Sequence, residues 1–458
     1  MKINNIKFIA LALTATLGVS SCSKSLLKDV NNNPNQAQDA PLSTLVTSTL
    51  AGSIIPFEGE NARFSGIWGQ TFTGTDRQYS AYDNYGVSAS DFHWEFFYYG
   101  NIQQANLAIT KADENLFYKG ICQISKGNSF GTMAALWGDI PFTQSNNLVE
   151  FPNPKFDGQL DVYAGAQKLL ADGIANINAA SITDESGVDF FYSGDAAKWV
   201  KAANTMRARY YMHIGDYASA QTAAAAGILD VADNMMIPHA GTYNQNMNVY
   251  ASFGEQDRQG YMGAQNAYLP TILDTNGAKN NAKTNEGERF ADLYVNAGDP
   301  ASYDLNYSGN LFSATSSFPM ITASENHLIM AEIAYRNNDD VNAILHLNHV
   351  RQILAAKYPA GQYDDYVLAD FEAGGIVDHG KGSALANIFH EIMREKYASL
   401  VGQIEVFNDL RRTNNELGLT PKGTATNLPQ RFLIPQDELN GNPNASTTGL
   451  FVATEANN

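Results

Sequence analysis

Apolar residues recur at helical spacing through most of the chain. In the segment 94–114, the apolar positions Phe97, Ile102 and Ala105 suit one helix, and Lys111 lies at its solvated end. Few segments alternate with a period of two. Further segments with the helical pattern span residues 160–180, 195–229, 325–354 and 384–412. The pattern predicts a mainly α fold.

Two of these helical segments are similar to each other. Aligning the stretch from Ala208 with the stretch from Ala331 places Gly215 on Asn338, and small residues recur where two helices must approach. Gly and Asn tolerate left-handed backbone conformation, so we expect both positions to lie where one helix turns into the next. The pattern is typical of tetratricopeptide helix pairs, present here as pairs within a larger body.

Three long stretches rich in Tyr, Asn, Gly and Ser interrupt the helices. They span residues 71–94, 239–270 and 274–309. Loops of this length inside a domain are usually functional or disordered, and disordered segments are poor in the aromatic residues found here. We therefore expect a helical body with long irregular loops, and we expect the loops to carry function.

The first residues have the pattern of a lipoprotein export signal. Lys2 and Lys7 precede a short apolar stretch that ends in small residues beside Cys22. A thiol at this position can be joined to diacylglycerol and become the first residue after cleavage. The alternative is a chance cysteine beside an ordinary cleavage site. We expect a signal peptide at 1–21, lipidation at Cys22, a flexible tether at 22–40 and a single domain at 41–458.

Composition and charge restrict the classes of ligand that the protein is expected to bind. The formal net charge of -18 becomes more negative once the signal peptide leaves, and it repels phosphate backbones, so nucleic acid is excluded as an expected ligand. Beyond the signal, no segment is apolar for long enough to span a bilayer as a helix. Once Cys22 carries lipid, Cys122 has no disulfide partner, so packing must hold the fold. No cofactor is expected.

Tyrosine-rich loops with interleaved Asp, Asn and Arg can bind a neutral polar ligand. Ring faces accept the C–H patches of a sugar or a peptide side chain, while amides and charges bind its hydroxyls or backbone. The candidate ligand-binding residues are Tyr79, Tyr82, Asp83, Tyr85, Trp94, Tyr243, Tyr250, Arg258 and Tyr261. The alternative for each ring is an ordinary core position, above all for Trp94 at a helix start. Ser80 and Asn84 argue against a dry core for the tyrosines beside them.

Signals for catalysis are weaker. His346 and His349 have a spacing that can bind metal, but no acidic or Cys partner completes a set. Glu391 and Glu395 lie one turn apart, and Arg394 between them favours ion pairing on a helix face. A retaining glycosidase stays open as an alternative, because its two carboxylates need only spatial proximity. No catalytic residue and no metal ligand is predicted.

Four short sequence motifs occur along the chain in a characteristic order. They are YYGNIQQANLAI at 98–109, LWGDIPF at 136–142, FNDLRRT at 407–413 and RFLIPQDELNGNP at 431–443. With the lipoprotein start, they resemble the SusD/RagB family of nutrient-binding outer-membrane lipoproteins of Bacteroidetes. Before FNDLRR the family usually carries a Gly followed by a basic residue and an aromatic, whereas here Gln403, Ile404 and Glu405 stand in that stretch, which indicates a divergent branch.

The resemblance implies an α-helical body with tetratricopeptide-like helix pairs. It also implies a lipid-anchored protein at the cell surface of the outer membrane that captures an oligosaccharide or a peptide and passes it to a SusC-like TonB-dependent transporter. The family's ligand contacts come from the aromatic-rich region before segment 94–114 and from a mid-chain loop, the regions of the candidate tyrosines. A secreted glycan-degrading enzyme and a helical-repeat scaffold without a small ligand are the alternatives.

The phrase FNDLRR is expected to be architectural. Arg411 and Arg412 can reach helix C-terminal carbonyls or Asp409, and so fix the last long helix to the preceding ones.

Overall fold

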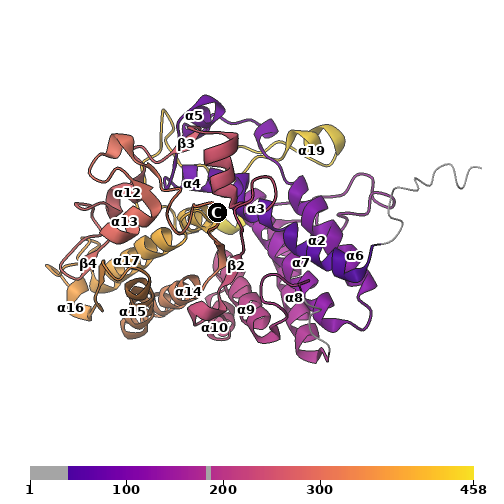
Figure 1. Ribbon diagram of the computed structural model, residues 1–458, viewed down its shortest axis with the longest axis horizontal. Helices are drawn as coiled ribbons and strands as arrows, with labels where there is room; N and C mark the ends of the chain where they lie inside the picture. Colours follow the sequence, from indigo (N-terminus) through magenta and orange to yellow (C-terminus); the bar gives the residue numbers. More distant parts are fainter. Residues whose placement is uncertain (1–39, 182–186) are drawn as a thin grey trace, which may run out of the picture. The chain divides into compact units, whose positions relative to one another are not determined.

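Helices dominate the residues that the computed structural model describes, 40–181 and 187–458 (Figure 1). The chain falls into two units, Met1–Pro41 and Leu42–Asn458, and the second unit holds every element described below. The predicted signal peptide and Cys22 lie outside the described residues.

Helices form nearly everywhere that the helical period predicts them. The α-helices are α2 (Leu42–Ala51), α3 (Ile54–Glu58), α4 (Glu60–Trp68), α5 (Arg77–Asp83), α6 (Gln103–Lys111), α7 (Leu116–Trp137), α8 (Gln159–Ala179), α9 (Ala196–His213), α10 (Tyr217–Ala225), α11 (Val249–Ala251), α12 (Tyr268–Leu273), α13 (Gly287–Leu293), α14 (Ala323–Arg336), α15 (Asp340–Lys357), α16 (Leu368–Phe371), α17 (Ala384–Ser399), α18 (Glu405–Arg412) and α19 (Gln436–Gly441). Two π-helices are η2 (Phe96–Ile102) and η4 (Ser252–Asp257). Short 3₁₀ turns are η1 (Ala89–Asp91), η3 (Val231–Asp233), η5 (Pro300–Ser302) and η6 (Glu455–Asn457). The prediction of a mainly α fold is confirmed.

The long helices pack side by side in an array (Figure 1). α7 packs on α8, α8 on α9, α9 on α10, α10 on α14, and α14 on α15. The contact of α10 with α14 joins the two helix pairs found in the sequence, α9/α10 and α14/α15. Their shared apolar cluster includes Ala208, Ala224, Ile329 and Ile333. Two pairs that are far apart in sequence therefore stack on each other.

The turns within these pairs have the predicted backbone. Gly215 has a φ of 72° and Asn338 a φ of 57°, both in the left-handed region that the alignment predicts. The next residue in each pair, Asp216 or Asp339, accepts a hydrogen bond from a backbone N–H in the first turn of the second helix. Local sequence therefore fixes both turns.

Short antiparallel strand pairs fasten the stretches between helices. The pairs are β1 (Thr73–Gly74) with β3 (Met262–Gly263), β2 (Met235–Ile237) with β7 (Phe318–Ile321), β4 (Thr284–Asn285) with β8 (Gln362–Tyr363), and β5 (Tyr294–Val295) with β6 (Asp304–Leu305). The β1–β3 pair brings two of the tyrosine-rich stretches together, with Thr73 opposite Gly263. A Cβ on Gly74 would lie 1.9 Å from the carbonyl oxygen of Tyr79, so this approach requires glycine.

The expectation that residues 71–94 form an exposed irregular loop is wrong over their middle part. The segment contains α5, whose N-cap residue is Asp76; the Asp76 side chain accepts a hydrogen bond from the N–H of Arg77, the first residue of the helix. Within α5, Tyr79 and Tyr82 are three residues apart, so both lie on the face that packs inward.

Aromatic rings from distant segments meet in the core. Trp68 of α4 lies 6.0 Å from Phe92 and 5.5 Å from Phe407 of α18 between ring centroids, and Phe432 lies 5.1 Å from Phe92. We call these four rings the aromatic wall. They are buried and rigidly packed, because interlocking rings leave little room for rotation.

The architectural role predicted for the FNDLRR phrase is confirmed. Arg411 Nη2 donates to the carbonyl of Ala135, near the C-terminal end of α7, at 2.9 Å, and its Nη1 donates to the carbonyl of Gln430 at 2.8 Å. Arg412 Nε donates to Asp409 at 2.6 Å. The two bonds of Arg411 fix α18 to α7 and to the C-terminal segment, and the Arg412–Asp409 bond lies within α18.

Candidate ligand-binding site

Four of the candidate tyrosines are core residues. Tyr79, Tyr82, Tyr85 and Tyr250 are only 3%, 7%, 6% and 0% exposed. The expectation that these rings are open to a ligand is wrong. Tyr79 and Tyr82 lie on the inward face of α5, Tyr85 is buried just after α5, and Tyr250 is buried within α11. Tyr250 shows the result most clearly, because its hydroxyl donates to the buried carbonyl of Gly402 at 2.7 Å.

The hydroxyls of Tyr79 and Tyr82 are also bound inside the protein. Arg63 Nε donates to the Tyr79 hydroxyl at 3.0 Å, and the Tyr79 ring lies 5.1 Å from that of Phe253. The Tyr82 hydroxyl donates to Asp91 at 2.6 Å. Burial raises the pKa of both phenols. These two tyrosines position the surrounding segments.

Asp83 and Tyr85 attach α5 to the C-terminal part of the chain. The Asp83 carboxylate pairs with the ammonium of Lys422, and the Tyr85 hydroxyl accepts a hydrogen bond from the Lys422 N–H at 3.1 Å. The Tyr85 ring meets the ring of Phe451 edge-on at 6.1 Å. Both residues therefore support neighbouring surface segments.

The remaining mid-chain candidates form a small exposed surface. The guanidinium groups of Arg77 and Arg258 each lie 5.8 Å from the ring centroid of Tyr261. Tyr243 is 42% exposed and its hydroxyl donates to Asp257 at 2.5 Å. We call these five residues the Tyr261 ledge. The β1–β3 pair and the π-helix η4 bring them together, so the two predicted regions do meet in space.

Trp94 lines a large cavity of about 980 Å³. The cavity lies between the segment that leads into η2, the segment that follows α7, and the start of α19. Its lining includes Phe92, His93, Trp94, Glu95, Tyr98, Tyr99, Gln103, Pro141, Asn146, Leu148, Pro435 and Glu438. We call it the Trp94 cavity. Its size and mixed aromatic and polar lining are typical of sites for small organic ligands.

The accessible ring of the Trp94 cavity is Tyr99. Tyr99 is 64% exposed, whereas Trp94 is 5% exposed and packs 5.7 Å from the rings of both Tyr98 and Trp137. The π-helix η2 carries Tyr99, and π-helical turns occur frequently at functional sites. Trp94 and Tyr98 thus form a packed base beside an open tyrosine ring.

Polar groups of the Trp94 cavity are positioned for a ligand. Asn146 Nδ2 donates to the carbonyl of Tyr98 at 3.0 Å, whereas its buried Oδ1 has no hydrogen-bond partner among the described residues. A buried acceptor without a partner is costly unless a water or a ligand binds it. Burial also raises the pKa of Glu438, which accepts a hydrogen bond from Asn442 at 2.7 Å.

Sequence reasoning missed Tyr99 and Asn146. The exposure of Tyr99 could have been predicted from the sequence. Tyr99 lies two residues beyond Phe97, which is buried, and so falls on another face of the same helix. Nothing in the sequence indicates the role of Asn146, because its position in the cavity depends on how the segment after α7 folds back on η2.

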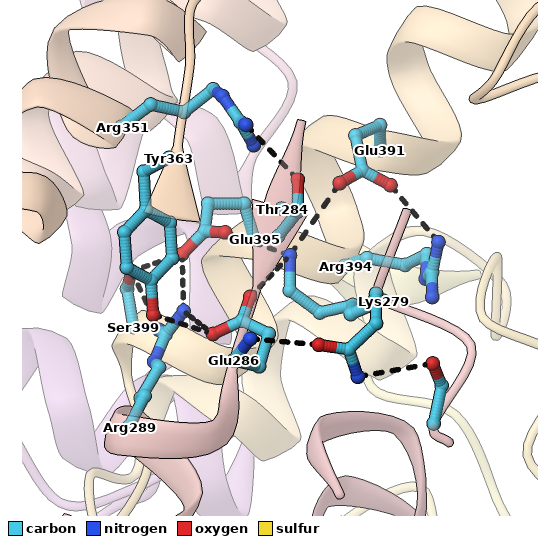
Figure 2. Close-up of polar contacts among 12 residues, drawn as sticks. Lys279, Thr284, Glu286, Arg289, Arg351, Tyr363, Glu391, Arg394, Glu395 and Ser399 are labelled. Carbon is cyan, nitrogen blue, oxygen red and sulfur yellow. Dashed lines mark hydrogen bonds and ion pairs between the residues drawn. The ribbon is translucent and has the colours of Figure 1, made fainter. Parts of the chain in front are cut away.

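The carboxylate pair considered in the sequence belongs to a buried ion network (Figure 2). Lys279 Nζ lies 2.7 Å from Glu395, 3.5 Å from Glu391 and 3.5 Å from Glu286, and Arg289 lies 2.9 Å from Glu395. Ion pairing of the two glutamates is confirmed, but within the core rather than on an exposed helix face. The network links the segment after α12 to α13 and α17.

The paired histidines pack against a third. His346 and His349 lie against His327 of α14, with ring centroids 5.6 Å and 4.9 Å from it. His327 Nε2 lies 3.2 Å from the carbonyl of Leu229, and burial lowers the pKa of His346 to about 4. Within residues 40–181 and 187–458, no group of three or more His, Cys, Asp or Glu is arranged to hold a metal ion.

The sequence matches one protein family over most of its length. The family described as "Starch-binding associating with outer membrane" matches residues 34–435. The chain belongs to the SusD-like family. No curated protein matches it. This family is associated with the outer membrane, and no helix in the described part of this SusD-like chain is long and apolar enough to cross a bilayer.

Solved structures show the same fold at low identity. A SusD/RagB family protein from Bacteroides thetaiotaomicron is 20% identical, with a TM-score of 0.68 over 89% of this chain and 95% of that one. A chitin-binding protein is 18% identical, with a TM-score of 0.69 over 91% and 100%. A SusD homologue from Parabacteroides distasonis is 17% identical, with a TM-score of 0.70 over 91% and 98%. These similarities confirm the SusD-like helical fold.

Proposed function

We propose that this SusD-like protein captures an oligosaccharide in the Trp94 cavity. One observation carries the proposal: the exposed ring of Tyr99 and the buried acceptor Asn146 Oδ1, which has no partner among the described residues, line the same cavity. The ring face of Tyr99 stacks on the C–H face of a pyranose, while Asn146 Oδ1 accepts a hydrogen bond from a sugar hydroxyl. The family description and the chitin-binding relative support a carbohydrate as the ligand.

The affinity is expected to be modest. An open cavity orders a flexible ligand and one exposed ring, so part of the contact energy is lost as conformational entropy. A protein that hands its ligand to a transporter also needs fast release, which tight binding prevents.

The test compares two exposed rings on the same π-helix. Tyr99 lines the cavity, whereas Phe96 is 49% exposed and is not part of the lining. Maltoheptaose and chitohexaose are titrated into the mature protein by calorimetry. We expect Tyr99→Ala to weaken binding of the better ligand by about 1 to 3 kcal/mol, and we expect Phe96→Ala to leave the binding unchanged. Equal affinities for wild type and Tyr99→Ala would refute the site.

An oligopeptide is the second ligand class considered. A mixed library of tetrapeptides, titrated under the same conditions, addresses it. Binding of peptides that depends on Tyr99, without binding of either saccharide, would replace the carbohydrate in the proposal.

We propose that the protein binds its ligand without cleaving it. Of the three carboxylates that line the Trp94 cavity, Glu95 lies 3.2 Å from His93 and Glu438 accepts a hydrogen bond from Asn442, whereas Asp437 is exposed to solvent. Prolonged incubation with maltoheptaose or chitohexaose is expected to leave both intact by chromatography. Shorter products that disappear in Glu438→Gln would support the glycan-degrading alternative instead.

The anchor and the transporter complete the proposal. We propose that Cys22 carries the lipid, that the protein faces the cell surface, and that it delivers its ligand to a SusC-like TonB-dependent transporter. Cys22→Ala is expected to abolish incorporation of labelled palmitate. Gentle purification from outer membranes is expected to recover the transporter in near-equal amount, whereas repeated recovery of the lipoprotein alone would argue against that partner.

A further inference from the structure

We propose that a second cavity, near the C-terminus, is an additional binding site for a neutral saccharide. Its volume is about 450 Å³, and its lining includes Trp68, Arg411, Asn414, Thr426, Asn427 and Phe451. We call it the C-terminal cavity. Its size is within the range of small-molecule pockets. The class of ligand rests on the proposed function, but the site itself rests on the observations that follow.

The C-terminal cavity has an aromatic surface that a sugar ring can use. Phe451 is 44% exposed, and the buried ring of Tyr85 supports it edge-on at 6.1 Å. The Tyr85 hydroxyl is itself bound to the N–H of Lys422. A ring that is already held in place loses little conformational entropy when a ligand stacks on it.

The charged side chain in this cavity is already hydrogen-bonded within the protein. Arg411 is the only charged residue of the lining that the structure describes, and it donates to the carbonyls of Ala135 and Gln430. No lining carboxylate and no free ammonium is therefore available to pair with an ionic ligand. The cavity favours a ligand without charge.

Neutral hydrogen-bonding groups remain open in the C-terminal cavity. The side chains of Asn414, Thr426 and Asn427 make no hydrogen bond to any residue that the structure describes, and Asn414 and Asn427 are exposed. Each amide offers both donors and an acceptor, which matches a hydroxyl that can act in either role. An aromatic face together with free amides fits a pyranose better than a peptide, whose charged ends would lack partners here.

The two cavities are neighbours across the aromatic wall. Phe92 lines the Trp94 cavity and Trp68 lines the C-terminal cavity, and their ring centroids are 6.0 Å apart. The two linings have no residue in common. Substitutions at Tyr99 and at Phe451 therefore address the two sites separately.

NMR chemical shifts measure saccharide binding at the C-terminal cavity directly. Maltotriose and triacetylchitotriose are added at millimolar concentration to the deuterated, ¹⁵N-labelled mature protein. We expect at least one of them to shift the side-chain amide resonances of Asn427. The shift should persist in Tyr99→Ala and be lost in Phe451→Ala. Val452→Ala is the matched control, because Val452 is 57% exposed beside Phe451 but is not part of the lining, and it should keep the shift.

Asn414→Gly provides a second variant that should not disturb folding, because glycine adopts the left-handed φ of 51° at this position and the Asn414 side chain makes no hydrogen bond to a described residue. We expect it to reduce the Asn427 shift at least fivefold. The proposal is overturned if neither saccharide moves Asn427, if the tripeptide Ala-Ala-Ala moves it and the saccharides do not, or if Tyr99→Ala abolishes the shift. A shift that persists while calorimetry shows no role for Tyr99 would retain this second site and refute the Trp94 cavity.

Discussion

The buried ion network and the Trp94 cavity both join distant segments, and both use residue types that are common in functional sites. In the network, Lys279 and Arg289 each have carboxylate partners within 3.5 Å (Figure 2). In the cavity, Tyr99 is 64% exposed and Asn146 Oδ1 has no partner among the described residues. The difference shows which polar groups stabilise the fold and which are open to a ligand.

Burying the ion network costs desolvation energy, and the attraction between its opposite charges offsets this cost within the core. Burial alone would lower the pKa of Lys279, but the charges of Glu395 and Glu391 outweigh it and raise the pKa. Such a network is stable only while it is complete, because one missing partner leaves buried charges of like sign together. The Trp94 cavity has no such dependence, so its open side chains can change with little effect on folding.

The largest expected effect comes from removing the central charge of the network. Lys279→Met leaves Glu286, Glu391 and Glu395 buried with one cation fewer, and we expect the free energy of unfolding to fall by about 3 to 5 kcal/mol. Urea denaturation followed by circular dichroism measures the loss. The folded fraction should bind maltoheptaose like the wild type, because Lys279 does not line the cavity.

The matched control is an exposed lysine in an ion pair. Lys168 lies 2.6 Å from Asp172, and its side chain is 74% exposed. We expect Lys168→Met to change the free energy of unfolding by less than about 0.5 kcal/mol. Equal effects of the two substitutions would show that burial of the Lys279 network contributes nothing to stability.

Tyr82→Ala tests the tyrosine region in the same way. Tyr82 is 7% exposed, packs 4.8 Å from the ring of Phe64 and donates to Asp91. Removing a buried aromatic ring leaves a cavity, so we expect a loss of about 3 kcal/mol in the free energy of unfolding. The exposed Tyr99→Ala should change it by less than about 0.5 kcal/mol.

Calorimetry on the two tyrosine variants completes this test. At a temperature where both are folded, Tyr82→Ala should bind maltoheptaose normally and Tyr99→Ala weakly. The reverse pattern, a stable Tyr82→Ala that no longer binds, would restore the site expected from the sequence.

The helical architecture follows from the sequence because its determinants are local. The turns at Gly215 and Asn338 are set by one residue each and capped by the next, so alignment alone locates both helix pairs. The kind of contact that Arg411 makes was predictable, since a basic residue in the last turn of a helix can donate to carbonyls at helix ends, but its partners Ala135 and Gln430 follow only from the fold.

The site was harder to predict because its determinants are not local. Ser80 and Asn84 indicated an exposed loop, but in a helix these polar residues lie on one face while Tyr79 and Tyr82 lie on the other. Asn146 has its partners and its open acceptor only because the segment after α7 folds back on η2. Trp94 does line a cavity, and its role in binding stays a prediction.

Lowering the pH tests how much the ion network contributes to stability. Burial would raise the pKa of Glu395, but the charges of Arg289 and Lys279 outweigh it and lower the pKa to about 2. A carboxylate with a lowered pKa stabilises the fold above its unfolded pKa, near 4.5, and this stability is lost as the pH falls toward 2. Between pH 6 and pH 3 we expect this one group to account for a loss of about 2 kcal/mol.

Urea denaturation at each pH, on wild type and Glu395→Gln, isolates this contribution. The variant is less stable at pH 6 but has no carboxylate to protonate at this position, so the difference between the two proteins should shrink toward pH 3. Parallel curves would mean that Glu395 titrates equally in the folded and unfolded chains.

The smallest expected effect belongs to the Tyr261 ledge, which is intermediate between the two regions compared above. Arg258 is exposed, donates to the carbonyl of Asp257 at 2.9 Å and lies 5.8 Å from the Tyr261 ring. Because these contacts are exposed to solvent and local, we expect Arg258→Ala to change the free energy of unfolding and the free energy of maltoheptaose binding by less than about 0.5 kcal/mol each. Denaturation and calorimetry on the same sample measure both. If binding weakens by more than about 1 kcal/mol while stability is unchanged, the ledge contacts the ligand directly, and the principal site then lies where the two tyrosine-rich stretches meet, not at Tyr99.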